Sequence, residues 1–392
     1  MLLPAKTSRH FSQMISIVPS LLLAGCLLST LPTHAADAVA KAGPDVLVFS
    51  NGDTLTGKLD HEAGGTVFFK SDNAGMVQVP WAKVKEIRTD QKFAVIETGE
   101  VVGRKKPNPD VPVGTISVRG DTLTVQAQNG TQQVPVKKIS YLVDQATYQK
   151  SVYKKQGLLQ GITGTLGAGA STVNSTQNSI SINTSVALSR VAPPVTWMPA
   201  RDRTLLNFSS NYGKVTQPNT PTVKTSILHG GLEEDEYFSP RFYLLQQAMF
   251  DHNFSQGLDL QQLYGLGAGY TVIKNAKQEL DVTAVMDYTK QQFSATGTTP
   301  ATSTNLVGSS FGDNYVRKFP KKIVLTEIAA FNAPWNSMSD YSSNVSVGAI
   351  FPVFKNFGFS VGVVDSYLNN PPAGFQGNSV QFNTALTYSI QR

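Results

Sequence analysis

The stretch "NSVQFNTALTYSI", residues 378–390, alternates between two kinds of side chain over its whole length. A period of two is typical of a β-strand whose two faces meet different surroundings. One face carries Val380, Phe382, Thr384, Leu386, Tyr388 and Ile390, and the other carries Gln381, Asn383, Ala385, Thr387 and Ser389. The second face holds amide, hydroxyl and small side chains rather than Lys or Glu. This pattern favours a membrane-spanning strand with one face toward lipid and the other toward a polar lumen.

The same alternation recurs throughout the second part of the chain. Strands of about ten residues can cross a bilayer, and they must close into a barrel because lipid offers no partner to an open edge. Bacterial barrels of this kind have an even number of strands. The sequence therefore predicts an all-β protein with a twelve-stranded antiparallel transmembrane β-barrel over residues 157–392, its strands at 157–171, 178–190, 203–212, 222–233, 240–251, 258–273, 278–291, 304–317, 322–332, 341–351, 356–366 and 378–390.

The connections between these segments differ in length in a regular way. Those after the third, seventh, ninth and eleventh strands are long, and those after the fourth, sixth, eighth and tenth are short. Short turns are typical of the periplasmic side, so both ends of the barrel are expected in the periplasm. One long connection, 191–202, breaks this rule. Aromatic residues near the short turns predict a girdle at one membrane interface: Tyr237, Phe238, Phe242, Phe319, Phe351, Phe354 and Phe357.

The region before the barrel contains an internal repeat. The pentapeptide GDTLT occurs at 52–56 and 120–124, but the sequences around the two copies do not align. A gapless register at an offset of 55 instead matches Gly, Val-Pro and Lys positions. Asn-Gly turn signals and β-branched runs mark the strands of each copy. We therefore expect two small tandem β-barrel-like modules of the SH3 or Sm type, at 45–92 and 93–145, a single sandwich built from both being the alternative.

The N-terminal segment has the features of a secretory signal peptide. Two basic residues precede an apolar run over 14–31, and a small-residue cleavage position follows at Ala35, before Ala36. We therefore expect residues 1–35 to be removed on export. The alternative is a lipoprotein signal, in which the only cysteine, Cys26, would be lipidated. Beyond the signal no apolar stretch of about 18 residues follows, so no transmembrane helix is expected.

Charge and glycine patterns disfavour several functions. The net charge is +6 and basic residues are scattered, so no nucleic-acid partner is expected. The run "GRKKPNPD" (103–110) is interpreted as a solvated linker. The glycine-rich stretches 164–169 and 265–270 lie within predicted strands rather than between a strand and a helix, so no cofactor is expected. The acidic run 233–236 is interpreted as charge at the periplasmic rim rather than a metal site.

Three acidic residues stand on the polar face of the seventh predicted strand, namely Glu279, Asp281 and Asp287. Inside a barrel such carboxylates either pair with Lys or Arg and plug the lumen, or favour cations in an open pore. The sequence leaves both alternatives open. These residues are the candidate lumen charges.

Lipid hydrolysis is the enzymatic alternative. It would use His229, His252 or Ser255, with Asp251 or Asp259 as the acid. A spacing of three residues between His252 and Ser255, close to a loop, is weak geometry for a nucleophile and its base. We therefore expect that the protein is not an enzyme and assign no catalytic residue.

The barrel region carries three stretches of recognisable sequence, 237–282, 315–331 and 367–390, with the motifs "FSPR" and "QGLD" and an ending in "NNPPAG" and "LTYSI". With these motifs the region resembles the DUF481 family of Gram-negative outer-membrane proteins. The front repeats look like segments that often precede such barrels. The resemblance implies an outer-membrane barrel without implying a particular activity. The chain departs from the usual pattern at its end, Ile390-Gln391-Arg392, where an aromatic residue is common.

These features together predict an outer-membrane protein that is structural or forms a narrow passive channel. Its front region, 45–145, would lie in the periplasm and bind a periplasmic protein or a cell-wall polymer. The barrel would contact outer-membrane lipid. A lipid hydrolase and a soluble periplasmic β protein are the alternatives.

Overall fold

A computed structural model describes residues 43–100, 108–153, 157, 160–175, 177–295 and 300–390 of the chain. The signal-peptide prediction, with Ala35, Ala36 and Cys26, lies outside these residues, as does most of the 103–110 linker. In this described part of the chain, no helix is both long enough and apolar enough to cross a membrane. The described residues are almost all in β-strands, as the sequence predicts.

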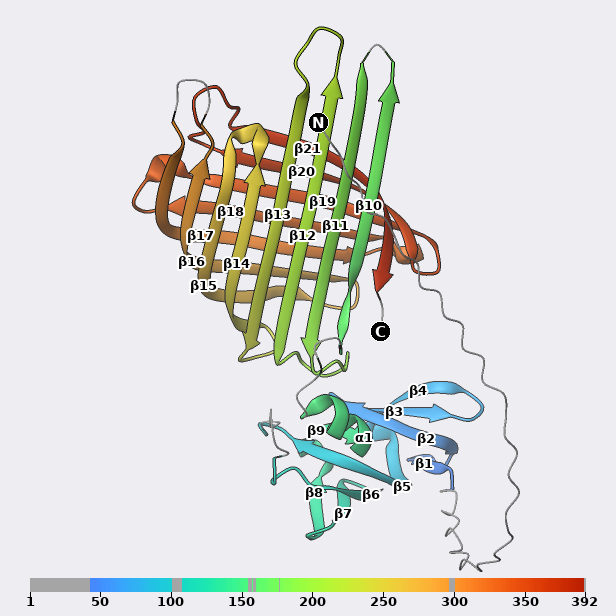
Figure 1. Cartoon of the computed structure of the whole chain (residues 1–392). Helices are drawn as coiled ribbons and strands as arrows, with labels where there is room; N and C mark the ends of the chain where they lie inside the picture. The colour runs from blue at the N-terminus through green and yellow to red at the C-terminus, as the bar shows by residue number, and fades with distance from the viewer. Residues whose placement is uncertain are drawn as a thin grey trace, which may run out of the picture. The chain divides into compact units, whose positions relative to one another are not determined.

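The second part of the chain forms a closed antiparallel barrel (Figure 1). Each strand pairs with its neighbours in sequence order, and the last strand pairs with the first. Each of the twelve predicted segments overlaps one strand, so the predicted barrel is confirmed. The strands are β10 (Ile162–Asn174), β11 (Asn178–Ala192), β12 (Asp202–Thr216), β13 (Val223–Tyr237), β14 (Phe242–Asn253), β15 (Leu258–Lys274), β16 (Gln278–Phe293), β17 (Thr302–Lys318), β18 (Val324–Pro334), β19 (Ser342–Phe354), β20 (Phe357–Leu368) and β21 (Asn378–Ile390).

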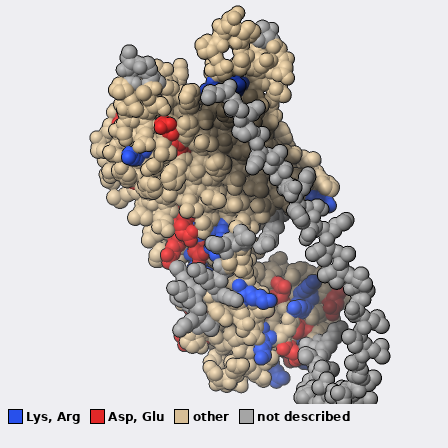
Figure 2. Space-filling model, in the orientation of Figure 1, with Lys and Arg blue, Asp and Glu red and all other residues tan. Residues whose placement is uncertain are grey.

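Side chains on the barrel strands alternate between the interior and the outer wall. On β16 the odd-numbered residues from Asp281 to Phe293 are buried or half-buried, whereas Val282, Met286 and Tyr288 are exposed. Figure 2 shows an outer wall with few charged side chains, and those visible on the barrel gather toward the strand ends. An apolar wall around a polar interior is the arrangement of a membrane barrel.

The two ends of the barrel differ in their connections. We name the end where β10 starts and β21 finishes the proximal end, and the opposite end the distal end. Figure 1 shows the β10–β11 and β12–β13 hairpins projecting beyond the other strands at the distal end. Four proximal turns are short, at 238–241, 275–277, 319–323 and 355–356. Four distal loops are longer, at 217–222, 294–301, 335–341 and 369–377, whereas the distal β10–β11 and β14–β15 connections are short.

The front domain contains nine strands, four of which close a ring. Strand β1 pairs with β2 and β5, and β9 pairs with the same two strands. The sheet continues from β2 into β3 and β4, and from β5 into β6, β7 and β8. The elements are β1 (Asp45–Phe49), β2 (Thr54–Ala63), β3 (Thr66–Ser71), β4 (Gly75–Pro80), β5 (Val84–Glu97), β6 (Val113–Arg119), β7 (Thr122–Ala127), β8 (Gly130–Pro135), β9 (Ile139–Asp144), α1 (Gln145–Thr147) and η3 (Tyr148–Val152).

The repeat is visible as the same series of elements at an offset of 55 residues. Strands β4 and β8 take the same place in the two copies, and each leads into a 3₁₀ turn, η1 (Trp81–Lys83) or η2 (Val136–Lys138). The two GDTLT copies lead into different strands, β2 and β7. Their equal sequence therefore does not mark equivalent positions.

The prediction of one module per repeat needs a correction. Strand β5 runs without interruption through the expected boundary between residues 92 and 93. Strand β9 of the second repeat then closes the ring with β2 and β5 of the first. The two repeats thus form one small barrel together, and one core cluster joins Leu59 and Phe69 of the first repeat to Val118 and Leu142 of the second. A repeat of about 50 residues alone would bury too little apolar surface for a stable fold.

The long proximal connection between β11 and β12 packs against the front domain. Trp197 stacks on His61 with ring centroids 4.2 Å apart. Met198 joins the apolar cluster that contains Val152, and Arg201 Nη1 donates to the Val152 carbonyl at 3.1 Å. These contacts give a physical reason why this connection is longer than the other proximal turns.

Candidate functional site in the barrel lumen

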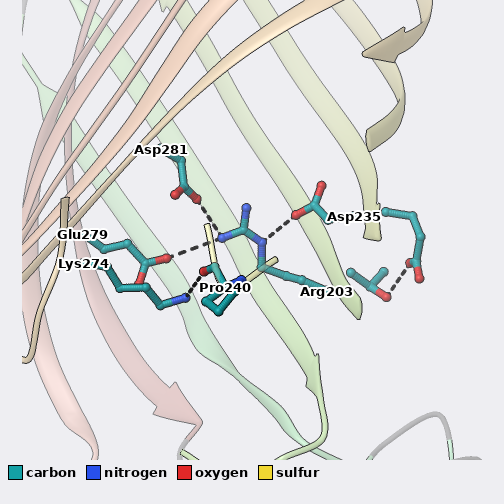
Figure 3. A network of polar contacts seen from close by, with 8 residues as sticks. Arg203, Asp235, Pro240, Lys274, Glu279 and Asp281 are labelled. Atoms are coloured by element: carbon teal, nitrogen blue, oxygen red, sulfur yellow. Dashed lines mark hydrogen bonds and ion pairs between the residues drawn. The ribbon is translucent and has the colours of Figure 1, made fainter. Parts of the chain in front are cut away.

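A dense polar cluster lies in the proximal part of the lumen and centres on Arg203 (Figure 3). Arg203 is the second residue of β12, and its side chain is buried. Its Nε donates to Asp235 Oδ2 at 2.6 Å, and its Nη1 donates to Asp281 Oδ2 at 2.8 Å. Glu279 Oε1 lies 3.6 Å from the same Nη1. We name Arg203, Asp235, Glu279 and Asp281 the proximal cluster.

The proximal cluster reaches across the lumen rather than along one wall. Asp235 is the direct neighbour of Arg203 on β13, but Asp281 lies on β16, three strands further around the barrel. In a circular barrel with strands about 4.8 Å apart and tilted by about 40°, strands four places apart would be separated by about 20 Å. The two side chains and their hydrogen bond reach only about 13 Å at bond lengths of about 1.5 Å. The barrel is therefore flattened at this level.

Charge and burial make this bridge sensitive to the loss of any member. One guanidinium faces three carboxylates, and Asp235 is 0% exposed. The Tyr237 and Tyr243 rings lie 5.7 and 5.1 Å from the guanidinium carbon and add cation–π attraction. Within the described residues, Asp235 Oδ1 and Asp281 Oδ1 have no hydrogen-bond partner. Removing the arginine would leave unpaired buried carboxylates, which is strongly unfavourable.

No metal site is apparent at this cluster. Among the residues that the structure describes, no group of three or more His, Cys, Asp or Glu side chains is arranged to hold a metal ion. The carboxylates of the proximal cluster face the guanidinium instead.

Apolar side chains fill the lumen next to the proximal cluster. Tyr243, Leu245 and Val285 form a buried cluster that projects inward from β14 and β16. The intervening strand β15 makes room for them with glycines. A Cβ on Gly269 would lie 2.2 Å from the Tyr243 ring, and one on Gly265 would lie 2.4 Å from Val285 Cγ1. The glycine-rich stretch 265–270 therefore serves close packing inside the barrel.

The distal end of the lumen is also crossed. The β14–β15 connection contains the 3₁₀ turn η4 (Phe254–Gln256), and Gln256 is 2% exposed. Its Nε2 donates to the Ser366 carbonyl at 2.9 Å and to the Gly377 carbonyl at 2.8 Å. Ser366 lies on β20, on the opposite side of the twelve-stranded ring from β14. Asn253 Nδ2 donates a hydrogen bond to Gln256 Oε1 at 2.8 Å. These contacts fix the turn across the distal mouth of the barrel.

The three candidate lumen charges separate into two groups. Glu279 and Asp281 belong to the proximal cluster, whereas Asp287 lies further along β16. Asp287 is buried and accepts a hydrogen bond from Ser310 Oγ at 2.5 Å. Ser310 in turn contacts Asn332 at 2.6 Å. Asp287 is therefore part of a polar ladder along the wall, apart from the Arg203 bridge.

Two sequence interpretations require correction here. The acidic run 233–236 is not rim charge, because it continues β13 and brings Asp235 into the lumen. Glu234 points the other way, where Thr204 Oγ1 contacts its Oε2 at 2.5 Å. Tyr237 was expected in the aromatic girdle but packs beside Tyr243 in the lumen. The remaining girdle residues are exposed, namely Phe238, Phe242, Phe319, Phe351, Phe354 and Phe357.

Arg203 and Asp235 were not predicted as site residues, Asp235 because the predicted fourth strand ended at 233 and Arg203 because its partners lie on other strands. Extending the alternation by two residues at the end of the fourth strand places Asp235 in phase with His229 and Glu233. Arg203 opens the third predicted strand and is in phase with its inward residues. The period-two alternation of the two strands could have identified both residues, but the acidic run 233–236 obscured it in the fourth strand.

The hydrolase candidates do not come together as a nucleophile and its base. His229 Nδ1 lies 2.6 Å from Asp251 Oδ1 in the lumen. His252 Nδ1 instead contacts the Asp259 backbone carbonyl at 2.7 Å. Ser255 is in η4, where its backbone N–H donates to the Asn253 side chain. In the described part of the chain, Ser255 and the two histidines thus have separate partners.

The front domain has a separate cavity of about 360 Å³, lined among others by Trp81, Lys137 and Tyr141. Glu62 lies beside it and is 0% exposed. Its Oε1 accepts a hydrogen bond at 2.8 Å from the N–H of Gly65, which lines the cavity. Burial raises the pKa of Glu62 to about 7, while the Gly65 hydrogen bond and the nearby Trp81 indole act in the opposite direction with smaller effect.

The closed ring of strands, its apolar outer wall and its polar interior define an outer-membrane-type β-barrel. The chain belongs to the family described as protein of unknown function DUF481, whose profile matches residues 164–390. The resemblance drawn from the sequence motifs is thereby confirmed. The comparison with curated proteins finds no relative of the chain.

Several solved barrels are similar to the chain at low identity. The β domain of the Bordetella autotransporter BrkA is 10% identical over 59% of this chain and 99% of its own, with a TM-score of 0.28. The translocator domain of the autotransporter NalP from Neisseria meningitidis is 10% identical over 59% and 87%, with a TM-score of 0.31. The CymD monoaromatic hydrocarbon channel is 11% identical over 59% and 88%, with a TM-score of 0.27. No functional property is transferred from these proteins.

Proposed function

We propose that this protein is an outer-membrane barrel whose lumen is closed at rest and becomes a narrow passage for small cations when the proximal cluster separates. The observation that carries the proposal is the reach of Arg203 from β12 to Asp281 on β16, at 2.8 Å. The Gln256 bridge at the distal mouth supports the same resting state. A permanently open channel is less well supported, because side chains cross the lumen near both of its ends.

The preference for cations follows from the charges at the constriction. When Arg203 turns away from Asp281, the carboxylates of Asp235, Glu279 and Asp281 line the widened passage. A ring of acidic side chains favours cations over anions. No catalytic role is part of the proposal, since the histidines and Ser255 have other partners.

The proposal places the proximal end and the front domain in the periplasm. This orientation is supported by the short proximal turns and by the predicted signal peptide. The cavity lined by Trp81 and Tyr141 would bind a cell-wall polymer, because half-buried aromatic rings at a cavity can stack on sugar rings. Co-sedimentation of the full chain with isolated cell-wall sacculi tests this, and the Trp81→Ala variant is expected to bind less. Equal binding by both proteins would remove this role from the cavity.

Planar-bilayer recording of the refolded full chain tests the closed lumen. The wild type is expected to show no stable conductance steps. Asp281→Asn removes the charge of the shorter contact between Arg203 and β16, leaving Glu279 at 3.6 Å, and is expected to give discrete steps that favour K⁺ over Cl⁻. Asp287→Asn is the matched control, because Asp287 is also buried on β16 but contacts Ser310. Steady conductance by the wild type, equal to that of Asp281→Asn, would overturn the proposal.

A further inference from the structure

The seam between the first and last strands is the weakest in the barrel. Strand β10 pairs with β21 only from Gly164 to Ala168, in five residue pairs. The next shortest barrel pairing, β18 with β19, has nine. Within the described residues, the distal parts of the two strands, 169–174 and 378–385, have no pairing across the seam. In hydrocarbon an unpaired strand edge is unfavourable, because lipid supplies no hydrogen bonds to the backbone.

The outer side chains along this edge lack neighbours as well. Phe382 is 71% exposed and Val380 is 63% exposed, more than most outward residues of the barrel. On the other strand, Val173 is 55% exposed. The seam therefore presents apolar side chains and free backbone groups at the same place.

A side chain from inside the lumen holds the unpaired part of β21. Asn211 on β12 donates from Nδ2 to Gln381 Oε1 at 3.3 Å and to Asn383 Oδ1 at 3.0 Å. These contacts pass over the inner faces of β10 and β11. At Gly169 strands β10 and β21 still lie close together, because a Cβ there would lie 2.2 Å from the Thr384 carbonyl and 2.8 Å from Asn183 Oδ1. Asn211 thus acts as a latch in place of a backbone ladder.

The lumen wall next to Asn211 carries polar, uncharged side chains, and the His229–Asp251 pair of strands β13 and β14 lies beside it, next to Ser209. The inward-facing residues near Asn211 carry amide or hydroxyl groups, namely Asn183, Ser181, Ser185, Ser209, Gln381 and Asn383. The acidic groups of the proximal cluster and Asp287 lie on β13 and β16, on other parts of the wall. A molecule that passes the seam would meet neutral hydrogen-bonding groups inside and apolar groups outside.

We propose that the distal half of the β10–β21 seam is a lateral portal, latched by Asn211, that admits a single-chain amphiphile with an uncharged hydrogen-bonding head group. The head would contact the amide and hydroxyl wall, and the chain would remain between β10 and β21 in the bilayer. This role goes beyond the proposed cation passage, because it uses a different opening and different residues.

Photolabelling of the reconstituted full chain tests the portal. The probe is a monoacylglycerol with a diazirine on its head group, and all variants carry Cys26→Ser. In the double variant Ser171→Cys/Asn383→Cys, oxidation forms a disulfide lock that closes the unpaired part of the seam. Thr165→Cys with Ser389→Cys is the control, because these residues are already paired. Labelling of lumen-facing peptides in β11 and β12 is expected to be lost in the oxidised lock, retained in the oxidised control and restored by reduction.

Three results would overturn the portal. Lumen labelling unchanged by the lock would show another route of entry, and labelling confined to the outer wall in every protein would show that no head group enters. Disulfide-linked dimers of the single Ser171→Cys variant would show that a second copy covers the edge instead. If the double-cysteine pair does not oxidise, a short bis-maleimide provides the lock.

Two substitutions on β12 test whether Asn211 acts as the latch. Asn211→Ala is expected to increase the initial labelling rate, because β21 loses its inner contacts. Asn207→Ala, also inward-facing on β12, is expected to leave the rate unchanged. Equal rates in both variants would remove the latch from the proposal. These readouts do not depend on ion flow, so they stand or fall separately from the conductance test.

Discussion

Glu62 offers a test in which the magnitude follows from the structure. Its carboxyl group is buried, and its pKa rises from 4.5 to about 7 on folding. Between these two pH values the unfolded chain loses the proton while the folded chain keeps it. Stability therefore falls as the pH rises through this window, by about 1.4 kcal/mol per pH unit, and about 3 kcal/mol is lost by pH 8. Glu62→Gln removes this titration.

The assay is urea unfolding of the full chain at several pH values, followed by tryptophan fluorescence. A Trp335→Phe background leaves only Trp81 and Trp197, and both lie in the front domain's packing. The difference in unfolding free energy between Glu62→Gln and the parent is expected to shift by about 3 kcal/mol in favour of Gln between pH 4 and pH 8.

A half-buried carboxylate in the same sheet, Glu86, supplies the control. Arg88 lowers the pKa of Glu86 through a hydrogen bond, so its charged form is favoured on folding. Glu86→Gln is therefore expected to lose a little stability at high pH, the opposite sign to Glu62→Gln. If the Glu62→Gln difference is independent of pH, the carboxyl group is hydrated and the burial argument fails.

Two further substitutions test the barrel. Gly269→Ala places a methyl group against the Tyr243 ring and is expected to reduce the heat-modifiable folded band on gels. Gly230→Ala is the control and is expected to be tolerated, because the space around Gly230 is open. Equal folded fractions of the two variants would argue against a packed lumen. Leu266 is 68% exposed on the outer wall, so Leu266→Arg is expected to cost about 2–4 kcal/mol of folding free energy in lipid, measured by urea titration in vesicles. Leu266→Ala is the uncharged control, and an equal cost for both would place this position outside the hydrocarbon.

The strands were predictable from sequence because their pattern is local. The alternation in 378–390 defines β21 with the same bounds that the structure has. Each segment carries its own signal, since one face meets the apolar surroundings and the other the lumen. The offset of 55 residues likewise predicted that β4 and β8 are equivalent.

The contacts between distant strands were not predictable in the same way. The Arg203–Asp281 bridge depends on how far the barrel is flattened, and no local pattern encodes the cross-section. The joining of the two front repeats depends on β9 pairing with β2 and β5, which are far from it in sequence. The lumen position of Asp235 was not predicted because Asp235 stands in a run of four acidic residues, although the period-two alternation continues through that run. Glu279 and Asp281 were found because their strand alternates clearly.

The bridge across the proximal lumen is tested most directly by measuring the distance between β12 and β16 with cross-linkers of defined length. Cysteines at Leu205 and Thr283 stand two residues beyond Arg203 and Asp281 and leave the proximal cluster intact, in a Cys26→Ser background. The flattened barrel brings these strands to about 13 Å, against about 20 Å in a circular barrel. A bis-maleimide that fits only the shorter separation is expected to link the two cysteines in the folded protein, and to link them less after Asp281→Asn. Linkage only by a longer reagent, unchanged by Asp281→Asn, would contradict the bridge.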